Sequence, residues 1–425
     1  MAAAICIYIS GTSGVYAQFE GLDRKLRNAP IEKRVPSELR PEGLSYKGFI
    51  FEPKISVSEK YTSNVLATEE NEKSDYITVV APGVKISKEY DGHSFFISGG
   101  ANIERFARRS EENKEEYNIA AGANIVLNSR WSFPFFVRKF MVKRARDALR
   151  DSELSKEPLG IQVLKAQTGI VRKFNRVSLE LIGGYESRRF DNGGSSDGNS
   201  AVIFSGGDRQ IYKTGLTANY DFPRDVKGKF PEHRLFGEIE YERQLYDRRS
   251  FVAGSFSGDD GSRHKIGLLA GFETRYKGLL FARIGGGFFH ENFDQQDIES
   301  TTSTDFTADI AYSPFSKMTM RFEAERNINQ DNGFTQGIKE SRFLLGADYE
   351  ILHNLYWEND ITYSIFEVTD EDREDKDYGA EMRLRYLNSR NLTSNLAIGY
   401  LQRESDQSEE SFKDLNFRIF FTTAF

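Results

Sequence analysis

From about residue 47 to its end, the sequence is a series of long runs in which apolar and polar residues alternate. In the last run one set of alternate positions is mostly apolar: Leu415, Phe417, Ile419, Phe421 and Thr423. The positions between them hold Asp414, Asn416, Arg418, Phe420, Thr422 and Ala424. Successive side chains of a β-strand point to opposite faces, whereas a helix repeats every ~3.6 residues. The run therefore predicts a strand with one apolar and one largely polar face.

The same alternation recurs along the chain. The apolar sets include Val177, Leu179 and Leu181, then Leu235, Gly237, Ile239 and Tyr241, then Met318, Met320, Phe322 and Ala324, then Met382, Leu384 and Tyr386. The polar sets opposite them are rich in charged residues. Strands of soluble proteins have about 5–6 residues, whereas these runs reach roughly 10–14, a length that suits tilted strands crossing an outer membrane.

The connections between the runs alternate between short and long. Short links lie near 90–92, 128–130, 175–176, 277–278, 314–316, 353–354 and 388–390, with a longer one near 222–232. Long polar links lie near 63–73, 108–114, 143–158, 190–207, 249–262, 292–302, 329–337, 369–376 and 405–412. Outer-membrane barrels have short periplasmic turns and long extracellular loops. The pattern predicts an all-β, antiparallel, up-and-down transmembrane barrel of about 18 strands (16–18), with both ends in the periplasm and an aqueous lumen.

Composition agrees with a barrel but does not by itself require one. The chain of 425 residues has 34 Phe, 20 Tyr and 36 Gly, and its mean hydropathy is −0.54. After the N-terminus no uncharged apolar stretch reaches the ~18 residues of a membrane helix. A soluble array of β-sandwiches would fit the composition nearly as well, so the run lengths and link lengths decide between the two. The net charge of −7 argues against a nucleic-acid partner.

The N-terminal part divides into two segments. Residues 1–17 contain an apolar stretch around Cys6 and the sequence Val15-Tyr16-Ala17, which predicts a signal peptide, truncated because a basic start is missing. The alternative is a buried N-terminal strand. Residues 18–46 mix charged residues and prolines without a period. They predict a periplasmic tail or a small plug, followed by the barrel over residues 47–425.

Residues 41–127 resemble the family of outer-membrane proteins called β-barrel porin type 2. The resemblance is carried by Arg40-Pro41, Gly48-Phe49-Ile50-Phe51-Glu52-Pro53, Tyr61-Thr62-Ser63-Asn64-Val65, Glu72 to Ile77 and Ala81-Pro82-Gly83-Val84. Where the family has a stretch like Asp-Asp-Asn, this chain has Thr62-Ser63-Asn64. Members often accompany genes for exopolysaccharide and capsule synthesis. The resemblance therefore implies location in the bacterial outer membrane and a role beside polysaccharide export proteins.

Enzymatic chemistry is not expected. The five histidines are scattered, no zinc spacing or phosphate loop occurs, and we expect neither a metal nor a cofactor. Acids such as Glu238 and Glu240 are alternate residues of one strand face, which favours a lumen wall over a glycosidase pair. The acidic run 370–375 is read as a solvated loop, with divalent ions beside lipopolysaccharide as the alternative. The glycine clusters, such as Gly285 to Gly287, are expected to permit bending or aromatic packing.

Several residues are predicted to serve the barrel directly. The pore-lining candidates are Glu238, Glu240, Glu242, Arg321, Glu323, Glu325, Arg383, Arg385 and Arg418. Around residues 139–150, basic and apolar residues stand at helical spacing, so Arg144 and Arg146 are candidates for a constriction. The alternatives are a surface loop and an overlong fifth strand. Phe421 and Phe425, in the terminal aromatic strand, resemble the signal read by the barrel assembly machinery.

Three functions remain open from the sequence. The leading hypothesis is a pore that exports exopolysaccharide or passes other hydrophilic solutes, with mixed charges creating a field across the lumen. The second is a general diffusion porin for small solutes. The third is a filled structural barrel that anchors envelope components. The expected partners are outer-membrane lipids and lipopolysaccharide, the assembly machinery, and polysaccharide or periplasmic export proteins.

Overall fold

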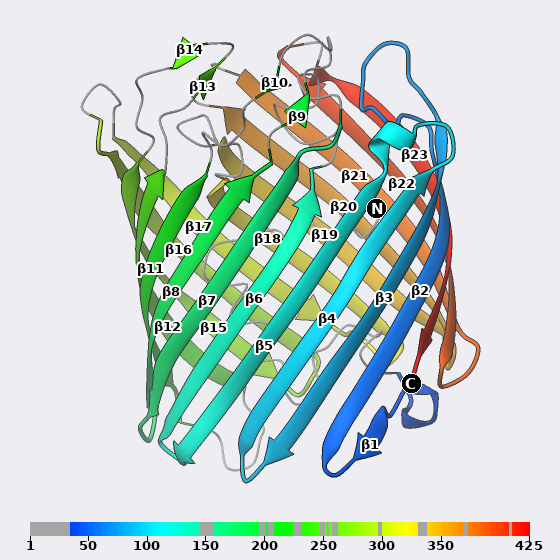
Figure 1. Cartoon of the computed structure of the whole chain (residues 1–425). Helices are drawn as coiled ribbons and strands as arrows, with labels where there is room; N and C mark the ends of the chain where they lie inside the picture. Colours follow the sequence, from blue (N-terminus) through cyan, green and yellow to red (C-terminus); the bar gives the residue numbers. More distant parts are fainter. Residues whose placement is uncertain are drawn as a thin grey trace.

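In a computed structural model the chain forms one closed β-barrel (Figure 1). The structure describes residues 35–144, 157–191, 193–194, 201–202, 208–223, 231–246, 251–252, 255–256, 262–295, 300–329, 338–368, 373–407 and 410–425. Eighteen antiparallel strands pair with their neighbours in chain order, and β2 pairs with β23 to close the ring. The predicted fold class and strand number are therefore confirmed.

The strands are long, as the alternating runs predicted. They are β2 (Phe49–Thr62), β3 (Asp75–Tyr90), β4 (His93–Phe106), β5 (Lys114–Asn128), β6 (Trp131–Lys143), β7 (Gly160–Lys173), β8 (Val177–Phe190), β11 (Arg209–Asp221), β12 (Glu232–Tyr246), β15 (Arg263–Tyr276), β16 (Leu280–Phe293), β17 (Thr301–Tyr312), β18 (Met318–Asn329), β19 (Ile338–Leu352), β20 (Leu355–Val368), β21 (Arg373–Leu387), β22 (Leu392–Ser405) and β23 (Phe412–Ala424). Two-residue pairs, β9 (Gly193–Gly194) with β10 (Ala201–Val202) and β13 (Phe251–Val252) with β14 (Ser255–Phe256), lie beyond the wall.

Short turns join the strands at one end of the barrel and long connections join them at the other (Figure 1). The turns at Asp91-Gly92 and Lys277-Gly278 have positive φ at both positions, at 47° and 79° and at 45° and 70°. Such pairs form the tight hairpin turns that match the twist of antiparallel strands, and glycine adopts the second position without steric cost. The described residues contain no helix long and apolar enough to cross a membrane.

The two faces of the wall follow the sequence alternation. The apolar residues of the last strand point outward and remain accessible, with Ile419 and Phe421 each 51% exposed. The other apolar sets do the same, as Leu181, Ile239, Met320 and Met382 illustrate. In a membrane these side chains contact lipid, and the charged residues of the opposite parity face the lumen.

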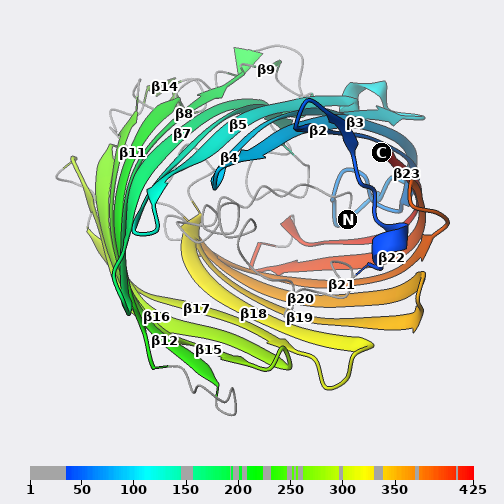
Figure 2. The ribbon, with the colours of Figure 1, turned by 90° about the horizontal axis from the view of Figure 1, so that it is seen from below.

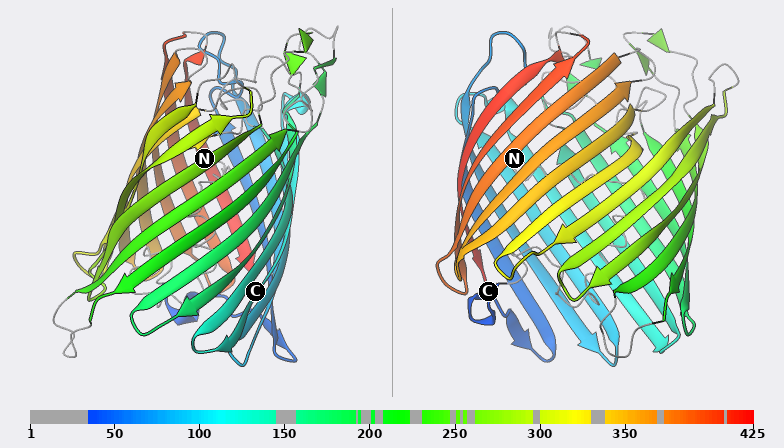
Figure 3. Two further views of the ribbon diagram at one scale, coloured as in Figure 1. Left: turned by 90° about the vertical axis from the view of Figure 1, so that its left-hand side faces the viewer. Right: turned by 180° about the vertical axis from the view of Figure 1, so that it is seen from behind.

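Outward-facing tyrosines mark both edges of this apolar surface. Tyr212 and Tyr220 lie eight positions apart on β11, and Tyr378 and Tyr386 lie eight positions apart on β21. At about 3.3 Å per residue and a tilt near 40°, eight residues span roughly 20 Å across the membrane, close to the apolar height of outer-membrane barrels. The views in Figure 3 show the common tilt of the strands.

Residues 35–46 lie at the mouth on the side of the short turns. They comprise a 3₁₀ turn, η2 (Ser37–Leu39), and β1 (Leu44–Tyr46), which pairs with the start of β2. Val35 and Leu39 pack against the buried Tyr356 and Leu387 of β20 and β21. Seen from below, η2 lies beside β22 at the rim of the barrel (Figure 2). This part of the predicted tail is thus attached to the rim, whereas residues 1–34 lie outside the described residues.

Candidate functional site: the inner wall of the barrel

The inner wall carries all nine pore-lining candidates. Each stands at the parity opposite to the exposed apolar residues of its strand, on β12, β18, β21 or β23. Most of the nine are partly covered by neighbouring side chains, and Glu242 is only 2% exposed. The wall is therefore a layer of interacting charges rather than a set of isolated ones.

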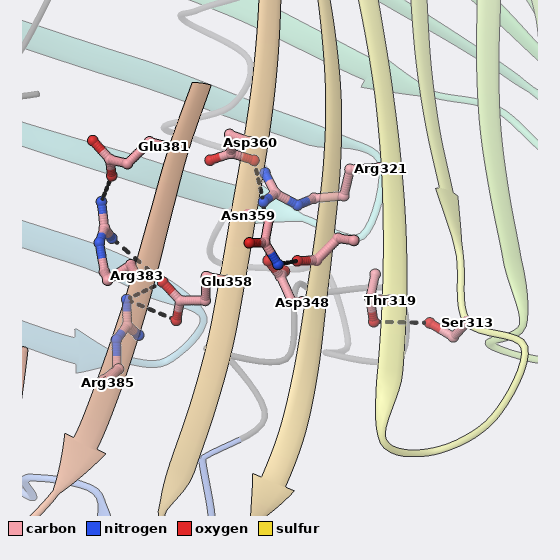
Figure 4. A network of polar contacts seen from close by, with 11 residues as sticks. Ser313, Thr319, Arg321, Asp348, Glu358, Asn359, Asp360, Glu381, Arg383 and Arg385 are labelled. Atoms are coloured by element: carbon pink, nitrogen blue, oxygen red, sulfur yellow. Dashed lines mark hydrogen bonds and ion pairs between the residues drawn. The ribbon is translucent and has the colours of Figure 1, made fainter. Parts of the chain in front are cut away.

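One network crosses β18 to β21 (Figure 4). Arg321 lies 3.1 Å from Asp348 and 2.9 Å from Asp360, so one guanidinium joins three strands. Farther along, the Glu358 carboxylate forms ion pairs with Arg383 at 3.4 Å and with Arg385 at 3.2 Å. Arg383 also forms an ion pair with Glu381 at 2.6 Å. Bridges between strands of this kind fix long charged side chains along the wall and limit how far they extend into the lumen.

Gly346 makes the first of these bridges possible. It stands directly between Arg321 and Asp360 in the strand register. A Cβ placed there would lie 2.6 Å from Asp360 Oδ1 and 2.9 Å from Arg321 Cζ, closer than real Cβ contacts. The guanidinium crosses β19 through space that any other residue would fill.

A second network covers β7 to β16. Glu186 pairs with Lys165 at 3.1 Å and with Arg188, and Glu242 pairs with Lys213 at 2.5 Å. Glu238 pairs with Arg283 at 2.5 Å. Glu242 is thus held by a cation of the neighbouring β11, and Glu238 by a cation of β16, two strands away.

Most large apolar side chains on the inner face are hidden beneath these charges. Phe236 is 4% exposed, with the Arg283 guanidinium 3.8 Å from its ring centre. Its ring lies against the inward Gly271 and Gly285, where a Cβ would come within 3 Å of it, as the sequence predicted for the glycine-rich run. Phe140 is 2% exposed and is stacked under Arg138 at 4.8 Å. The lumen therefore meets a polar surface rather than an aromatic one.

The charges are distributed unevenly around the wall. On β17 to β20 the inward positions hold nine carboxylates and two guanidiniums: Asp305, Asp309, Glu323, Glu325, Glu340, Asp348, Glu350, Glu358 and Asp360, with Arg321 and Arg342. On β4 to β7 they hold two carboxylates and four cations: Glu104, Glu116, Lys114, Arg138, Lys165 and Lys173. The two groups of strands face one another across the barrel (Figure 2). An acidic wall, β17–β20, thus lies opposite a basic wall, β4–β7.

The acidic wall has acids that neighbour one another. Asp309 is the register partner of Glu323, and Thr307 is the partner of Glu325. Within the part of the chain that the structure describes, Glu323 and Glu325 form no ion pair shorter than 4 Å, and Glu323 is exposed. Glu323 is thus the more open of the two, whereas Glu325 also has Arg342 as its register partner on β19.

The structure also places Arg144, Arg418, Phe421 and Phe425. Arg144 follows β6 at its loop end, where its backbone N–H donates to the Leu159 carbonyl at 2.8 Å; Arg146 lies outside the described residues. Arg418 stacks on Phe420 at 4.7 Å on the inner face. Phe421 and Phe425 are about half exposed on the outer face, and the Phe425 N–H donates to the Pro53 carbonyl at 3.1 Å.

Sequence reasoning missed several parts of the site. It named Arg321 but neither of its partners, Asp348 and Asp360, although both stand at inward parity. It also left out Glu358, which joins Arg383 to Arg385. Strand parity could have found all three, whereas the role of Gly346 depends on the register. In the described residues no group of three His, Cys, Asp or Glu is placed to hold a metal ion.

Comparison with known proteins identifies relatives of the whole barrel. A family model described as "Putative beta-barrel porin 2" matches residues 37–424, far beyond the 41–127 segment in which the sequence resemblance was seen. No curated protein sequence matches the chain.

Solved outer-membrane proteins show a distant likeness to the chain. The outer membrane protein OpdK from Pseudomonas aeruginosa is 10% identical, with a TM-score of 0.46 over 88% of this chain and 99% of that one. The ferric enterobactin receptor PfeA from Pseudomonas aeruginosa is 7% identical, with a TM-score of 0.48 over 91% and 82%. Likenesses this distant carry no argument about what this chain transports.

Proposed function

The chain belongs to the beta-barrel porin 2 family of the bacterial outer membrane, and on that premise we propose that its lumen is a water-filled passage for hydrophilic solutes that favours cations over anions. The observation that carries the proposal is the acidic wall. Carboxylates outnumber guanidiniums there by nine to two, and the basic wall opposite offsets only part of that charge. An excess of acids along a pore raises the local concentration of cations and lowers that of anions.

The polar inner surface supports passage rather than a solid core. An 18-stranded barrel is too wide for its own side chains to fill, and barrels of about this size hold aqueous channels. Ion pairs along the wall keep the long side chains close to it. The constriction hypothesis for Arg144 and Arg146 would favour anions; Arg144 begins the connection at the rim, so we assign selectivity to the acidic wall instead.

Solute entry into liposomes tests this proposal. Purified protein is reconstituted, and swelling is followed in isotonic solutions of a neutral sugar, a cationic amino acid and an anionic amino acid of similar size. We expect swelling in all three, fastest with the cation. Vesicles that do not swell would contradict a passage, and fastest swelling with the anion would contradict the selectivity.

Export of exopolysaccharide is a second candidate. It is favoured by the family resemblance and by the many paired guanidinium and carboxylate groups, which can donate to and accept from sugar hydroxyls along the wall. Deleting the gene should then lower the amount of polysaccharide at the cell surface, and a variant with the lumen blocked should not restore it. Unchanged surface polysaccharide would count against export and leave solute diffusion as the function.

A further inference from the structure

Charged residues on the outer face of the barrel form an organised patch. Most outward positions are apolar, yet five charged side chains share the outward parity at the loop ends of β18 to β21: Arg326, Lys339, Glu367, Glu374 and Lys376. We call them the outer patch. These strands lie side by side on the side of the barrel seen in the right-hand view of Figure 3.

The outer patch is built in rows across neighbouring strands. Lys339 is the register partner of Glu367, and Glu367 is the partner of Glu374. The next row toward the membrane centre contains Arg326 and Lys376, which reach each other through Ser341 and Ile365. The charges are therefore neighbours on one surface and not scattered substitutions.

Carboxylates hold the cations in place. Glu367 accepts Arg326 at 2.8 Å and lies 3.9 Å from Lys339, and Glu374 lies 2.7 Å from Lys376. All five side chains keep between about a fifth and a half of their surface accessible. On β22, Glu404 is the outward register partner of Lys376, so three acids balance the three cations. The cationic groups keep part of their surface accessible and can also contact a ligand from outside.

An aromatic row lies directly beneath the patch. Phe343, Tyr363 and Tyr378 are register partners on three strands, with ring centres 6.3 Å and 5.2 Å apart. Tyrosines gather where the hydrocarbon meets the polar headgroups. The patch is two to four residues beyond this row and therefore lies at the depth of headgroups in the outer leaflet.

We propose that the outer patch binds a phosphate-bearing glycolipid of the outer leaflet, with Arg326, Lys339 and Lys376 contacting its phosphates and the aromatic row packing against its acyl chains. The row of guanidinium and ammonium donors and its depth beside the aromatic row select this occupant. A phosphate accepts hydrogen bonds from guanidinium and ammonium groups together, and the apolar part of the same molecule covers the rings below. The proposal rests on the membrane placement of the barrel and not on what passes through its lumen.

Titration of the full-length protein with lipid A tests the proposal. Binding is measured by native mass spectrometry in detergent, with bisphosphorylated lipid A and with its dephosphorylated form. The double variant Arg326→Ala with Lys339→Ala removes two cations. Since a cation at an anionic lipid surface changes affinity about fivefold, we expect binding of the phosphorylated form to fall roughly 25-fold.

Matched controls keep the result interpretable. Lys88→Ala with Arg172→Ala removes two outward cations at the opposite edge, where they lie over Phe49 and Trp131, and should leave binding unchanged. Glu367→Gln removes a carboxylate but no cation and should retain or tighten binding. Heat-modifiable migration on gels and unchanged bilayer conductance verify that each variant is a folded barrel.

Three results would overturn the proposal. The first is equal affinity for phosphorylated and dephosphorylated lipid A, which would show that only acyl chains are recognised. The second is equal loss of binding in Glu367→Gln and in the cation variant, which would show that the patch has a structural role only. The third is self-association through the patch in place of lipid binding, detected as a dimer that the cation variant abolishes.

Discussion

The Gly346→Ala substitution is a direct test of how the inner wall is assembled. The added methyl group would lie 2.6 Å from Asp360 Oδ1 and 2.9 Å from Arg321, so the bridge between these two side chains must open or shift. A hydrogen bond to a charged group contributes about 1.5–3 kcal/mol. Because the Asp360 side chain is 36% exposed, solvent screening lowers the contribution of this hydrogen bond. We therefore expect a loss of about 1 kcal/mol of folding free energy.

The assay is urea-induced unfolding in lipid vesicles. Trp357, outward on β20 and 40% exposed, reports on the strand that carries Asp360. Gly286→Ala is the matched control, because a Cβ at that outward glycine would meet no atom within 4 Å. It measures the general effect of replacing glycine, which by restricting the unfolded chain stabilises by about 0.4–1 kcal/mol where the conformation is compatible.

A double-mutant cycle decides whether the cost arises at the bridge. If Gly346→Ala acts by separating Arg321 from Asp360, it should cost little in the background of Asp360→Asn, where the ion pair is already lost. Independent sites add within about 0.3–0.5 kcal/mol. Additive costs, or an equal cost for Gly286→Ala, would refute the role assigned to Gly346.

Three further predictions concern selectivity, pH and assembly. Glu323→Gln with Glu325→Gln should shift the bilayer reversal potential toward zero, whereas Lys376→Ala on the outer face should leave it unchanged. At the loop end of the barrel, outside the membrane, a hydrogen bond from Arg243 lowers the pKa of Asp294. A lowered pKa in the folded state stabilises the fold above the ordinary aspartate pKa, about 4. This stabilisation is lost as the pH falls through the pKa of the folded state. The melting temperature of Asp294→Asn should accordingly be lower than that of the native protein at neutral pH, and the two should converge in acid. Phe425→Ala should lower the amount of folded barrel in cells but not the yield of refolding in detergent, and equal losses in both would contradict an assembly signal.

The sequence could predict the wall because the wall is periodic. Alternation over runs such as 415–423 separates a lipid face from a lumen face, and a one-residue slip would bury every charge in lipid. Hairpin turns such as Asp91-Gly92 fix the local register. Strand number, the inward parity of Arg321 and the outward parity of Phe421 all follow from these local features.

Other parts depend on contacts that local patterns do not encode. Val35 and Leu39 pack against Tyr356 and Leu387, more than 300 positions away, so the attachment of this segment could not be seen in its own irregular sequence. Gly346 acquires its role only because the register places it between Arg321 and Asp360. Strand parity places Arg326 and Lys339 on the outward face, which is otherwise apolar. Only the aromatic row beneath them shows that this end of the face lies at the depth of the lipid headgroups.

Single-channel recording in planar bilayers under a salt gradient tests the central claim most directly. We predict steady conductance steps from the purified protein and a reversal potential whose sign shows that cations cross more readily than anions, because the acidic wall outweighs the basic wall opposite it. A protein that is folded and inserted but gives no steps, or one whose reversal potential shows a preference for anions, would contradict a cation-favouring passage.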